Sequence, residues 1–185
     1  KFTPPLTLQK QEAINDLQMG LLIKIPLLFD GNRLGLGENN RVEYNLASKD
    51  IGTGCYFLAW PTGYNYLMGF IGGKFGWDLY NHGHEAVVDY AIEKLIFLVG
   101  SKVKKHFIKG FVSDWADNPL TLGSYAAAKP GVGRSREKLQ GLESGKILFA
   151  GEALEPEIYG LVNGAFENGK KAAFLLAKKI KGNLE

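Results

Sequence analysis

The chain has 185 residues, of which 45% are hydrophobic, and this content excludes an intrinsically disordered protein and suffices for one core or for a domain and part of a second. Its 22 basic and 19 acidic residues give a net charge of +3, and the basic residues are mostly scattered along the chain. This pattern argues against a nucleic-acid-binding protein. The single cysteine, Cys55, excludes intrachain disulfides and a zinc site built on several thiolates. We therefore expect a reducing, cytoplasmic location, and no apolar run approaches the ~18 residues of a membrane span.

The N-terminal half predicts one helix and then an antiparallel sheet. Residues 8–19 have helical propensity, with Thr7 as a candidate N-cap and Gly20 as a stop signal. Residues 22–30 alternate as a strand, and Pro26 predicts that this strand is irregular or lies at a sheet edge. One face of the strand carries Ile23, Ile25, Leu27 and Phe29, and the opposite face carries Lys24. After a loop at 31–40, three more strands are expected at 42–46, 55–60 and 66–72.

The C-terminal half predicts two helices separated by a long irregular stretch. Apolar residues at helical spacing over 85–99, followed by Gly100, predict a helix with a glycine C-cap. Residues 103–114 are rich in strand formers. The next stretch, 116–145, is a long loop region, and a loop of that length in a compact domain is usually functional. A short buried strand at 146–150 and a helix at 160–180 end the chain.

The strand, loop and helix at 146–181 form the strongest constellation in the sequence. A helix that begins just after a strand and a turn directs free backbone N–H groups and a partial positive charge at one place, which stabilises an electron-rich ligand edge. Small residues at 160, 164, 165 and 169 would allow a close approach to this helix. Tight packing of a helix on a sheet, as in any α/β domain, explains the same pattern equally well.

These residues also resemble a known family. The run Phe149-Ala150-Gly151-Glu152, with Leu161-Val162 nine residues further on and Gly-Ala after it, is similar to the C-terminal flavin-binding motif of flavin-containing amine oxidases. The resemblance implies that Gly151, Glu152, Leu161 and Val162 contact FAD. It also implies that the helix start faces the N1/C2 carbonyl edge of the flavin, where the reduced cofactor is negative.

A second segment, residues 114–125, is similar to the Trp…Gly-Ser-Tyr segment of the same family. The resemblance implies that Trp115 lies near the flavin and that Tyr125 forms one wall of an aromatic cage for the substrate amine, since aromatic faces attract cations. For an isolated Trp and Tyr, core packing would be the simpler interpretation. Ser124 stands where covalent monoamine oxidases carry a cysteine bonded to FAD, so a noncovalent flavin is implied.

A third segment, at the start of the chain, resembles the family order of Pro-Pro-Leu, helix and Lys-x-x-x-x-Phe. The resemblance implies that Lys24 holds a water at flavin N5, which would serve oxygen activation or imine hydrolysis. Without the resemblance, a solvated lysine on a strand is the favoured interpretation.

The chain departs from the family pattern at two points. Leu161 occupies the place of the second aromatic cage wall, and Tyr159 lies two positions early, so the amine is left unspecified. No Gly-x-Gly-x-x-Gly motif opens a convincing helix, so we expect the pyrophosphate of FAD to bind residues outside this chain. The start without Met, in a proline-stiffened segment, reads as a cut end.

A possible metal cluster at 81–85 is weaker. The run Asn81-His82-Gly83-His84-Glu85 offers two imidazoles and a carboxylate but no third ligand at a suitable spacing. A solvated helix start is the favoured interpretation. We expect no metal site.

The expected fold is α+β or α/β, with a mainly antiparallel substrate-domain sheet, flanking helices and a C-terminal strand–loop–helix that would complete a Rossmann-like FAD-binding domain. The expected boundaries are 1–113 for the substrate-binding portion, 114–145 for an active-site loop and linker, and 146–185 for the FAD-binding segment.

The expected function is oxidation of a monoamine or polyamine to an imine, with hydride transfer to noncovalent FAD and reoxidation by O2 to H2O2. The expected partners are the amine and O2, with neither nucleic acid nor membrane, and a homo-oligomer is left open. The chain alone is expected to be inactive. The alternatives are a related desaturase or protoporphyrinogen-oxidase-like enzyme and a non-catalytic binding module.

Overall fold

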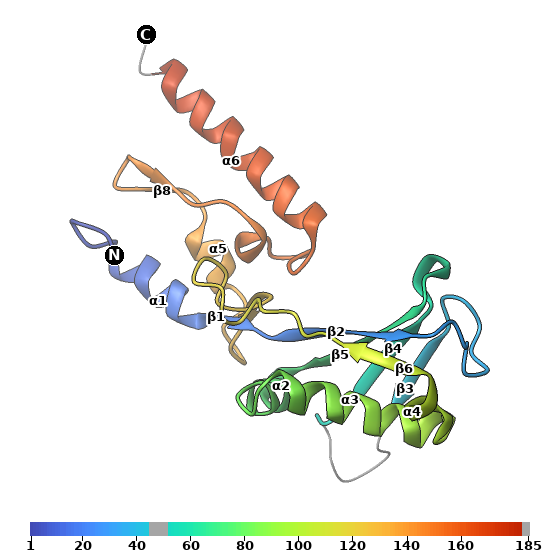
Figure 1. Cartoon of the computed structure of the whole chain (residues 1–185). Coiled ribbons are helices and arrows are strands. Elements are labelled where there is room, and N and C mark those ends of the chain that lie inside the picture. Colours follow the sequence, from blue (N-terminus) through green and yellow to red (C-terminus); the bar gives the residue numbers. More distant parts are fainter. Residues whose placement is uncertain (45–51, 183–185) are drawn as a thin grey trace. The chain divides into compact units, whose positions relative to one another are not determined.

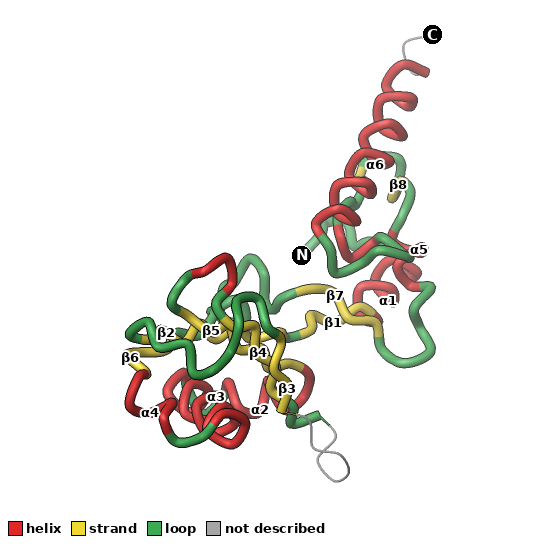
Figure 2. The backbone as a smooth tube through the Cα atoms, turned by 90° about the vertical axis from the view of Figure 1, so that its right-hand side faces the viewer, coloured by secondary structure: helices red, strands yellow, loops and turns green. Residues whose placement is uncertain are grey.

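The computed structural model describes residues 1–44 and 52–182 (Figure 1). The chain forms two compact units, of which unit 1 is Lys1–Gly20 with Tyr125–Glu185 and unit 2 is Leu21–Ser124. These divisions differ from the expected boundaries at 113 and 145. The first 20 residues join the C-terminal part because β1 (Leu17–Gly20) pairs antiparallel with β7 (Tyr125–Ala128), as Figure 2 shows. The functional labels given to the three expected segments stay predictions.

Unit 2 is built on a five-stranded antiparallel sheet with the order β3-β4-β5-β2-β6. The strands are β2 (Leu22–Phe29), β3 (Arg41–Tyr44), β4 (Cys55–Ala59), β5 (Tyr66–Gly72) and β6 (Phe107–Gly110). The predicted antiparallel strands are confirmed here, while residues 45–46 of the strand predicted at 42–46 lie outside the described residues. In β2 the alternation is as predicted, because Ile23, Ile25 and Leu27 are fully buried and Lys24 is exposed.

Pro26 was predicted to make this strand irregular or place it at an edge, and only the first half is right. The strand lies between β5 and β6, and its register with β6 shifts between Leu28 and Phe29. A proline is tolerated inside the sheet here because β6 ends opposite Leu27. The missing N–H of Pro26 therefore removes one hydrogen bond at a point where the pairing with β6 is already ending. The Pro26 carbonyl still accepts a hydrogen bond from the Phe111 N–H at 3.0 Å.

Helices cover one face of this sheet (Figure 1). They are α2 (Gly73–Tyr80), α3 (His84–Val99) and α4 (Lys102–His106). The predicted helix at 85–99 is confirmed by α3, whereas α2 was not predicted. The predicted strand at 103–114 is wrong over its first residues, which form α4. A helical turn here places Val103 in the core, where it is fully buried.

Unit 1 contains short strands and three helices. Its elements besides β1 and β7 are α1 (Leu8–Asp16), α5 (Ser135–Leu139), β8 (Leu142–Glu143), β9 (Ile147–Leu148), a 3-10 helix (Glu152–Leu154) and α6 (Val162–Gly182). The predicted helix 8–19 ends early at Asp16, because the next residues form β1. The predicted strand 146–150 is reduced to two residues paired with β8, and the stretch 116–145 contains β7, α5 and β8.

Unit 1 combines a small buried apolar cluster with buried polar contacts. Among the described residues, its buried apolar cluster consists of Ala13, Leu139 and Leu154, with Leu17, Phe149 and Ala153 partly buried against it. Beside it the buried Lys10 ammonium donates to the carbonyls of Leu139 and Gln140, each at 2.6 Å, and burial lowers the pKa of this lysine. So small a core leaves the unit dependent on these buried polar contacts.

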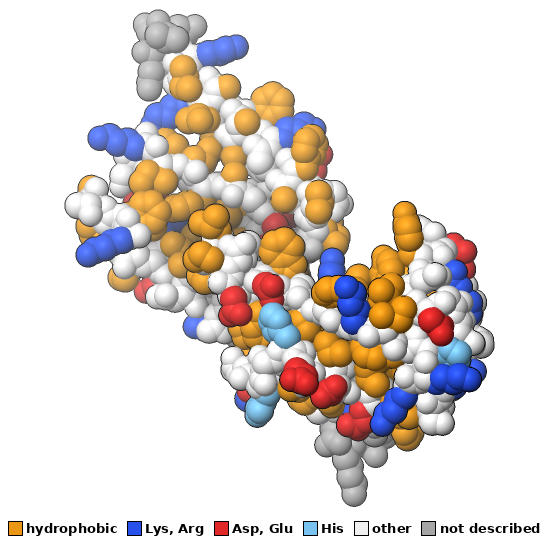
Figure 3. Space-filling model, in the orientation of Figure 1, with side chains coloured by type: hydrophobic (Ala, Val, Ile, Leu, Met, Phe, Trp, Pro, Cys, Tyr) orange, Lys and Arg blue, Asp and Glu red, His pale blue; other side chains and the backbone are white. Residues whose placement is uncertain are grey.

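Helix α6 leaves most of its side chains uncovered in this structure. Only Gly164 and Asn168 are buried along its length. Figure 3 shows hydrophobic side chains gathered on the surface of this region, and the exposed ones on α6 are Val162, Phe166, Phe174, Leu175, Leu176 and Ile180. Among the described residues, no helix is both long and apolar enough to cross a membrane.

Candidate functional site

The predicted site residues divide between the two units. Unit 2 contains Lys24 and Trp115, and unit 1 contains the remaining ones, namely Tyr125, Gly151, Glu152, Leu161 and Val162.

Lys24 stands on the sheet face of unit 2 that the helices leave free. Strand alternation directs it away from the core because both neighbours in sequence, Ile23 and Ile25, are buried. Within the described part of the chain, no side chain or carbonyl bonds the Lys24 ammonium. The ammonium is therefore free to bind a water or a ligand.

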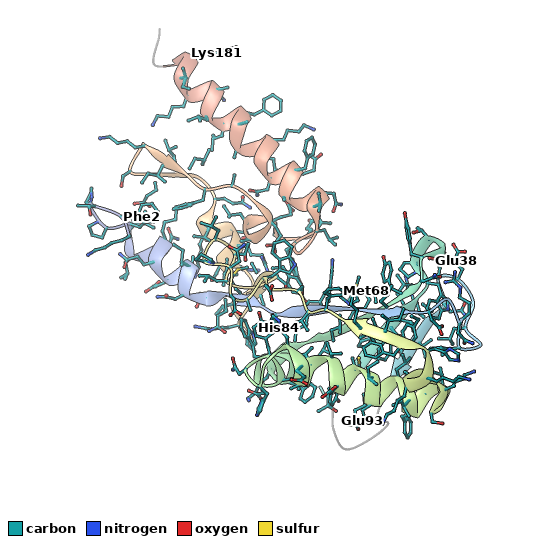
Figure 4. All side chains as sticks on the ribbon, viewed as in Figure 1. Phe2, Glu38, Met68, His84, Glu93 and Lys181 are labelled. Carbon is teal, nitrogen blue, oxygen red and sulfur yellow. The ribbon has the colours of Figure 1, made fainter. Side chains whose placement is uncertain are left out.

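The free sheet face beside Lys24 is apolar. In the strand register Lys24 stands opposite Phe70, and Phe70 in turn stands opposite Tyr56. Met68, which lies opposite Pro26, is labelled in Figure 4 on the side of the sheet away from Glu93 of α3. The prediction of site residues missed these neighbours, although the period-2 pattern that placed Lys24 would have found them.

Trp115 lines a cavity of about 880 Å³ in unit 2 and is 46% exposed. The same cavity is lined by His84, Asp114 and Asp117. The backbone carbonyl of Trp115 accepts bonds from the Gly123 N–H at 2.9 Å and from the Thr121 hydroxyl at 2.7 Å. These bonds fix the loop around Trp115 while its ring stays accessible.

The imidazoles of the 81–85 run serve local contacts. His84, at the start of α3, lies 3.0 Å from the Asp114 carboxylate, and His82 Nδ1 lies 2.7 Å from the Asp78 carbonyl. Tyr80 donates to Asp117 at 2.9 Å, and burial together with this bond raises the pKa of Tyr80. Across residues 1–44 and 52–182, no group of three or more His, Cys, Asp or Glu could hold a metal ion.

In unit 1, Glu152 and Tyr125 meet at Gly160. The Glu152 carboxylate accepts bonds from the Gly160 N–H at 2.9 Å and from the Ala126 N–H at 3.2 Å. A Cβ at Gly160 would lie 4.0 Å from Tyr125 Cγ, so the Tyr125 ring passes beside this turn. The carboxylate thereby connects the 3-10 helix at Glu152–Leu154 with the turn before α6 and with β7.

Tyr159, which lies two positions before Leu161, is also near this place. It lines the same groove as Tyr125, a cavity of about 970 Å³, and its ring centroid lies 4.1 Å from the Arg136 guanidinium carbon. Arg136 is buried and donates to the carbonyls of Ala126 and Ala153. One face of the Tyr159 ring is therefore already occupied by a cation.

The start of α6 has the properties expected for binding an electron-rich ligand edge. Leu161 and Val162 are 54% and 89% exposed, and the first N–H groups of the helix have no partner within it. Gly151 has a φ of +131°, and no atom lies within 4 Å of the place a Cβ would take. The donors and the open space fit the edge of a flavin.

The small residues of α6 differ in what approaches them. At Gly164 a Cβ would collide with the carbonyl oxygen of Ile158, so the close neighbour is the turn that precedes the helix. At Gly169 no atom lies within 4 Å of the Cβ position. Helix packing therefore explains Gly164 without any cofactor.

Comparison with known proteins assigns the family. A model of the family described as flavin containing amine oxidoreductase matches residues 1–176. The chain belongs to this family. The predicted family is confirmed, and membership of this amine oxidoreductase family implies a flavin cofactor.

Individual relatives of this amine oxidoreductase chain are more distant. It is 33% identical over 184 residues to polyamine oxidase 3 of Oryza sativa subsp. japonica, a match that covers 94% of this chain and 35% of the relative. It is 30% identical over 176 residues to polyamine oxidase 2 of Arabidopsis thaliana, covering 94% and 34%. The chain thus spans about a third of the length of the curated relatives it matches.

A solved structure shares the fold of this amine oxidoreductase chain. The chain matches cyclohexylamine oxidase from Brevibacterium oxydans IH-35A with a TM-score of 0.72 and 20% identity, covering 98% of this chain and 40% of that chain. At this identity the match shows the fold alone. The mixed α/β architecture with antiparallel sheets is confirmed.

Proposed function

We propose that this chain is the substrate-facing part of an oxidase that converts an amine to an imine. The observation that carries the proposal is a lysine with a free ammonium on an apolar, uncovered sheet face, in a chain whose family match runs over residues 1–176. FAD, when bound, would accept a hydride from the amine carbon and pass two electrons to O2, which yields H2O2.

Lys24 would hold a water at flavin N5. Its ammonium can donate up to three hydrogen bonds, and no described group competes for them. A water fixed there would be placed for imine hydrolysis or for proton supply during oxygen reduction. This assignment rests on the family resemblance and on the geometry around Lys24.

The aromatic residues would select and orient the amine. An exposed Trp115 ring attracts a cation through its face, and the family resemblance gives Tyr125 the same role. The apolar row of Phe70 and Met68 beside Lys24 supports a substrate with a hydrocarbon portion next to its reacting amine. We infer a small aliphatic amine or polyamine, in agreement with the polyamine oxidases among the relatives.

The flavin would be held noncovalently, at the turn before α6. Gly151, Leu161 and Val162 would surround it, and Glu152 would fix the backbone that presents the N–H groups. Ser124 cannot form the thioether that a cysteine makes, and its hydroxyl is bonded to the main chain of Leu22.

The uncovered side of α6 would pack on the remainder of a Rossmann-like FAD-binding domain. Six large hydrophobic side chains exposed on one helix are more than a stable surface helix usually presents. The chain by itself would then retain no stoichiometric FAD and would show no oxidase activity. A cytoplasmic location stays part of this proposal.

The test is amine-dependent peroxide release from the FAD-loaded protein that contains this chain. We expect peroxide with at least one of spermidine, putrescine or cyclohexylamine, and an aromatic monoamine is included for comparison. Acid precipitation should release the FAD into the supernatant, and FAD that stays with the pellet would contradict noncovalent binding. Bound FAD without peroxide from any amine would contradict the oxidase assignment.

A further inference from the structure

The main chain on both sides of Lys24 is bonded to a single residue, Ser113. The Lys24 N–H donates to the Ser113 hydroxyl at 3.0 Å, and the Ser113 N–H donates to the Lys24 carbonyl at 3.0 Å. Both bonds lie beyond the end of β6, where no regular strand continues the sheet. The hydroxyl of Ser113 thus supplies the acceptor that a strand carbonyl would otherwise supply.

A second serine makes an equivalent contact two residues earlier in β2. The Ser124 hydroxyl accepts from the Leu22 N–H at 3.0 Å and donates to the Leu22 carbonyl at 3.1 Å. Between Ser113 and Ser124 runs the loop that contains Trp115. The loop that contains Trp115 is therefore hydrogen-bonded to β2, the strand of Lys24, at both of its ends.

The loop between the two serines is itself bonded internally. The N–H groups of Asp117 and Asn118 both donate to the Asp114 carbonyl at 3.2 Å, next to the bonds already described at the Trp115 carbonyl. These bonds join the residues of the loop to one another rather than to distant elements. Displacing either serine should therefore shift the main chain of β2 relative to the Trp115 loop.

We propose that Ser113 and Ser124 are positioning residues for the oxidase, with Ser113 setting the position of Lys24. This proposal rests on the proposed function of Lys24 as the residue that holds a water at the flavin. The Lys24–Ser113 bond is exposed, so its removal leaves no buried unsatisfied donor and the fold should survive. The effect should then fall on position, where a displacement of about 1 Å can cost up to ~100-fold in rate.

The test measures flavin reoxidation by O2 after reduction with dithionite, in the FAD-loaded protein that contains this chain. This half-reaction needs no amine, so its outcome is separate from whether any amine is a substrate. We expect Ser113→Ala to slow reoxidation by roughly 5- to 50-fold and Ser113→Thr, which keeps the hydroxyl, to restore the rate. Ser101→Ala is the matched control, because the Ser101 hydroxyl caps nothing at the start of α4.

A double-mutant cycle separates positioning from general destabilisation. If Ser113 acts through Lys24, then Ser113→Ala in a Lys24→Met background should cause no further slowing. If Ser113→Ala does not retain flavin, Ser113→Cys, which is similar in shape but a weak acceptor, gives the same comparison.

Three results would overturn the proposal. The first is that Lys24→Met slows flavin reoxidation while Ser113→Ala reoxidises at the wild-type rate. This result would leave the role of Lys24 intact. Another is additive slowing in the double variant. The third is that Lys24→Met reoxidises at the wild-type rate, which would contradict the proposed role of Lys24 as well. The oxidase assignment would still stand in that case if an amine reduces the flavin.

Discussion

Cys55 lies at the start of β4 and has no exposed surface. Burial raises the pKa of its thiol to about 12. At pH 8 only about one thiol in 10⁴ would be ionised, and the thiolate is the reactive form. We predict that iodoacetamide modifies Cys55 only as fast as the protein unfolds, measured by mass spectrometry with a urea-unfolded sample as control. Modification of the native protein at the rate of free cysteine would contradict this burial.

Glu143 provides a pH-dependent contribution to the stability of unit 1. Its buried carboxylate accepts bonds from the Thr7 N–H at 3.0 Å and the Thr7 hydroxyl at 2.8 Å, and these bonds hold its pKa below the usual 4.5. Because the pKa is lowered on folding, the contribution is present above the unfolded pKa and is lost as the pH falls through the folded pKa.

We therefore predict that Glu143→Gln lowers the free energy of unfolding at pH 7 and that the difference from wild type shrinks below pH 4.5. Urea unfolding followed by circular dichroism over this pH range measures it. Glu137→Gln, at an exposed position of α5, is the control and should change little. Parallel pH curves for wild type and Glu143→Gln would show that the carboxylate makes no such contribution.

At the residue scale, the sequence predicted which side chains of a strand are buried and which are exposed, but it did not predict their hydrogen-bond partners. The exposure of Lys24 and the burial of its neighbours follow from strand alternation, which is local. The bonds from Ser113 to Lys24 and from Glu143 to Thr7 join residues 89 and 136 positions apart. No local pattern carries that information, so these positioning contacts emerged only from the structure.

At the scale of elements, Gly164 of α6 offers a test of helix packing. A Cβ at this position would strike the Ile158 carbonyl, and backbone can yield only by moving the turn before the helix. We predict that Gly164→Ala destabilises the protein by about 1–3 kcal/mol. The matched control is Gly169→Ala, which meets open space in the same helix and should stabilise by roughly 0.5–1 kcal/mol. Equal effects in thermal unfolding would contradict the close approach at Gly164.

The errors in predicting elements have tertiary causes. Helix α1 ends at Asp16 although the sequence stays helix-compatible to Met19, because β1 gains a partner in β7. The stretch after Lys102 forms α4 because the core takes up Val103 from a helical turn. Long periodic segments such as α3 were predicted correctly, since their amphipathic pattern needs no knowledge of a distant partner.

At the scale of the whole molecule, the family match spans residues 1–176, and the sequence motifs divide between the two units. The predicted boundaries placed the chain start in the substrate portion, but residues 1–20 belong with unit 1 through β1 and Lys10. That pairing could not be read from the sequence because it joins segments more than 100 residues apart. The site residues predicted from motifs stay predictions until they are tested by mutation.

The central claim is that these residues form the substrate-facing part of an FAD-dependent amine oxidase. The most direct measurement is the absorbance of the bound flavin in the FAD-loaded protein when amines such as spermidine and cyclohexylamine are added without oxygen, followed by peroxide detection when oxygen is admitted. We predict that at least one amine bleaches the flavin and that oxygen then restores the absorbance with formation of peroxide. A flavin that stays oxidised with every amine would contradict it.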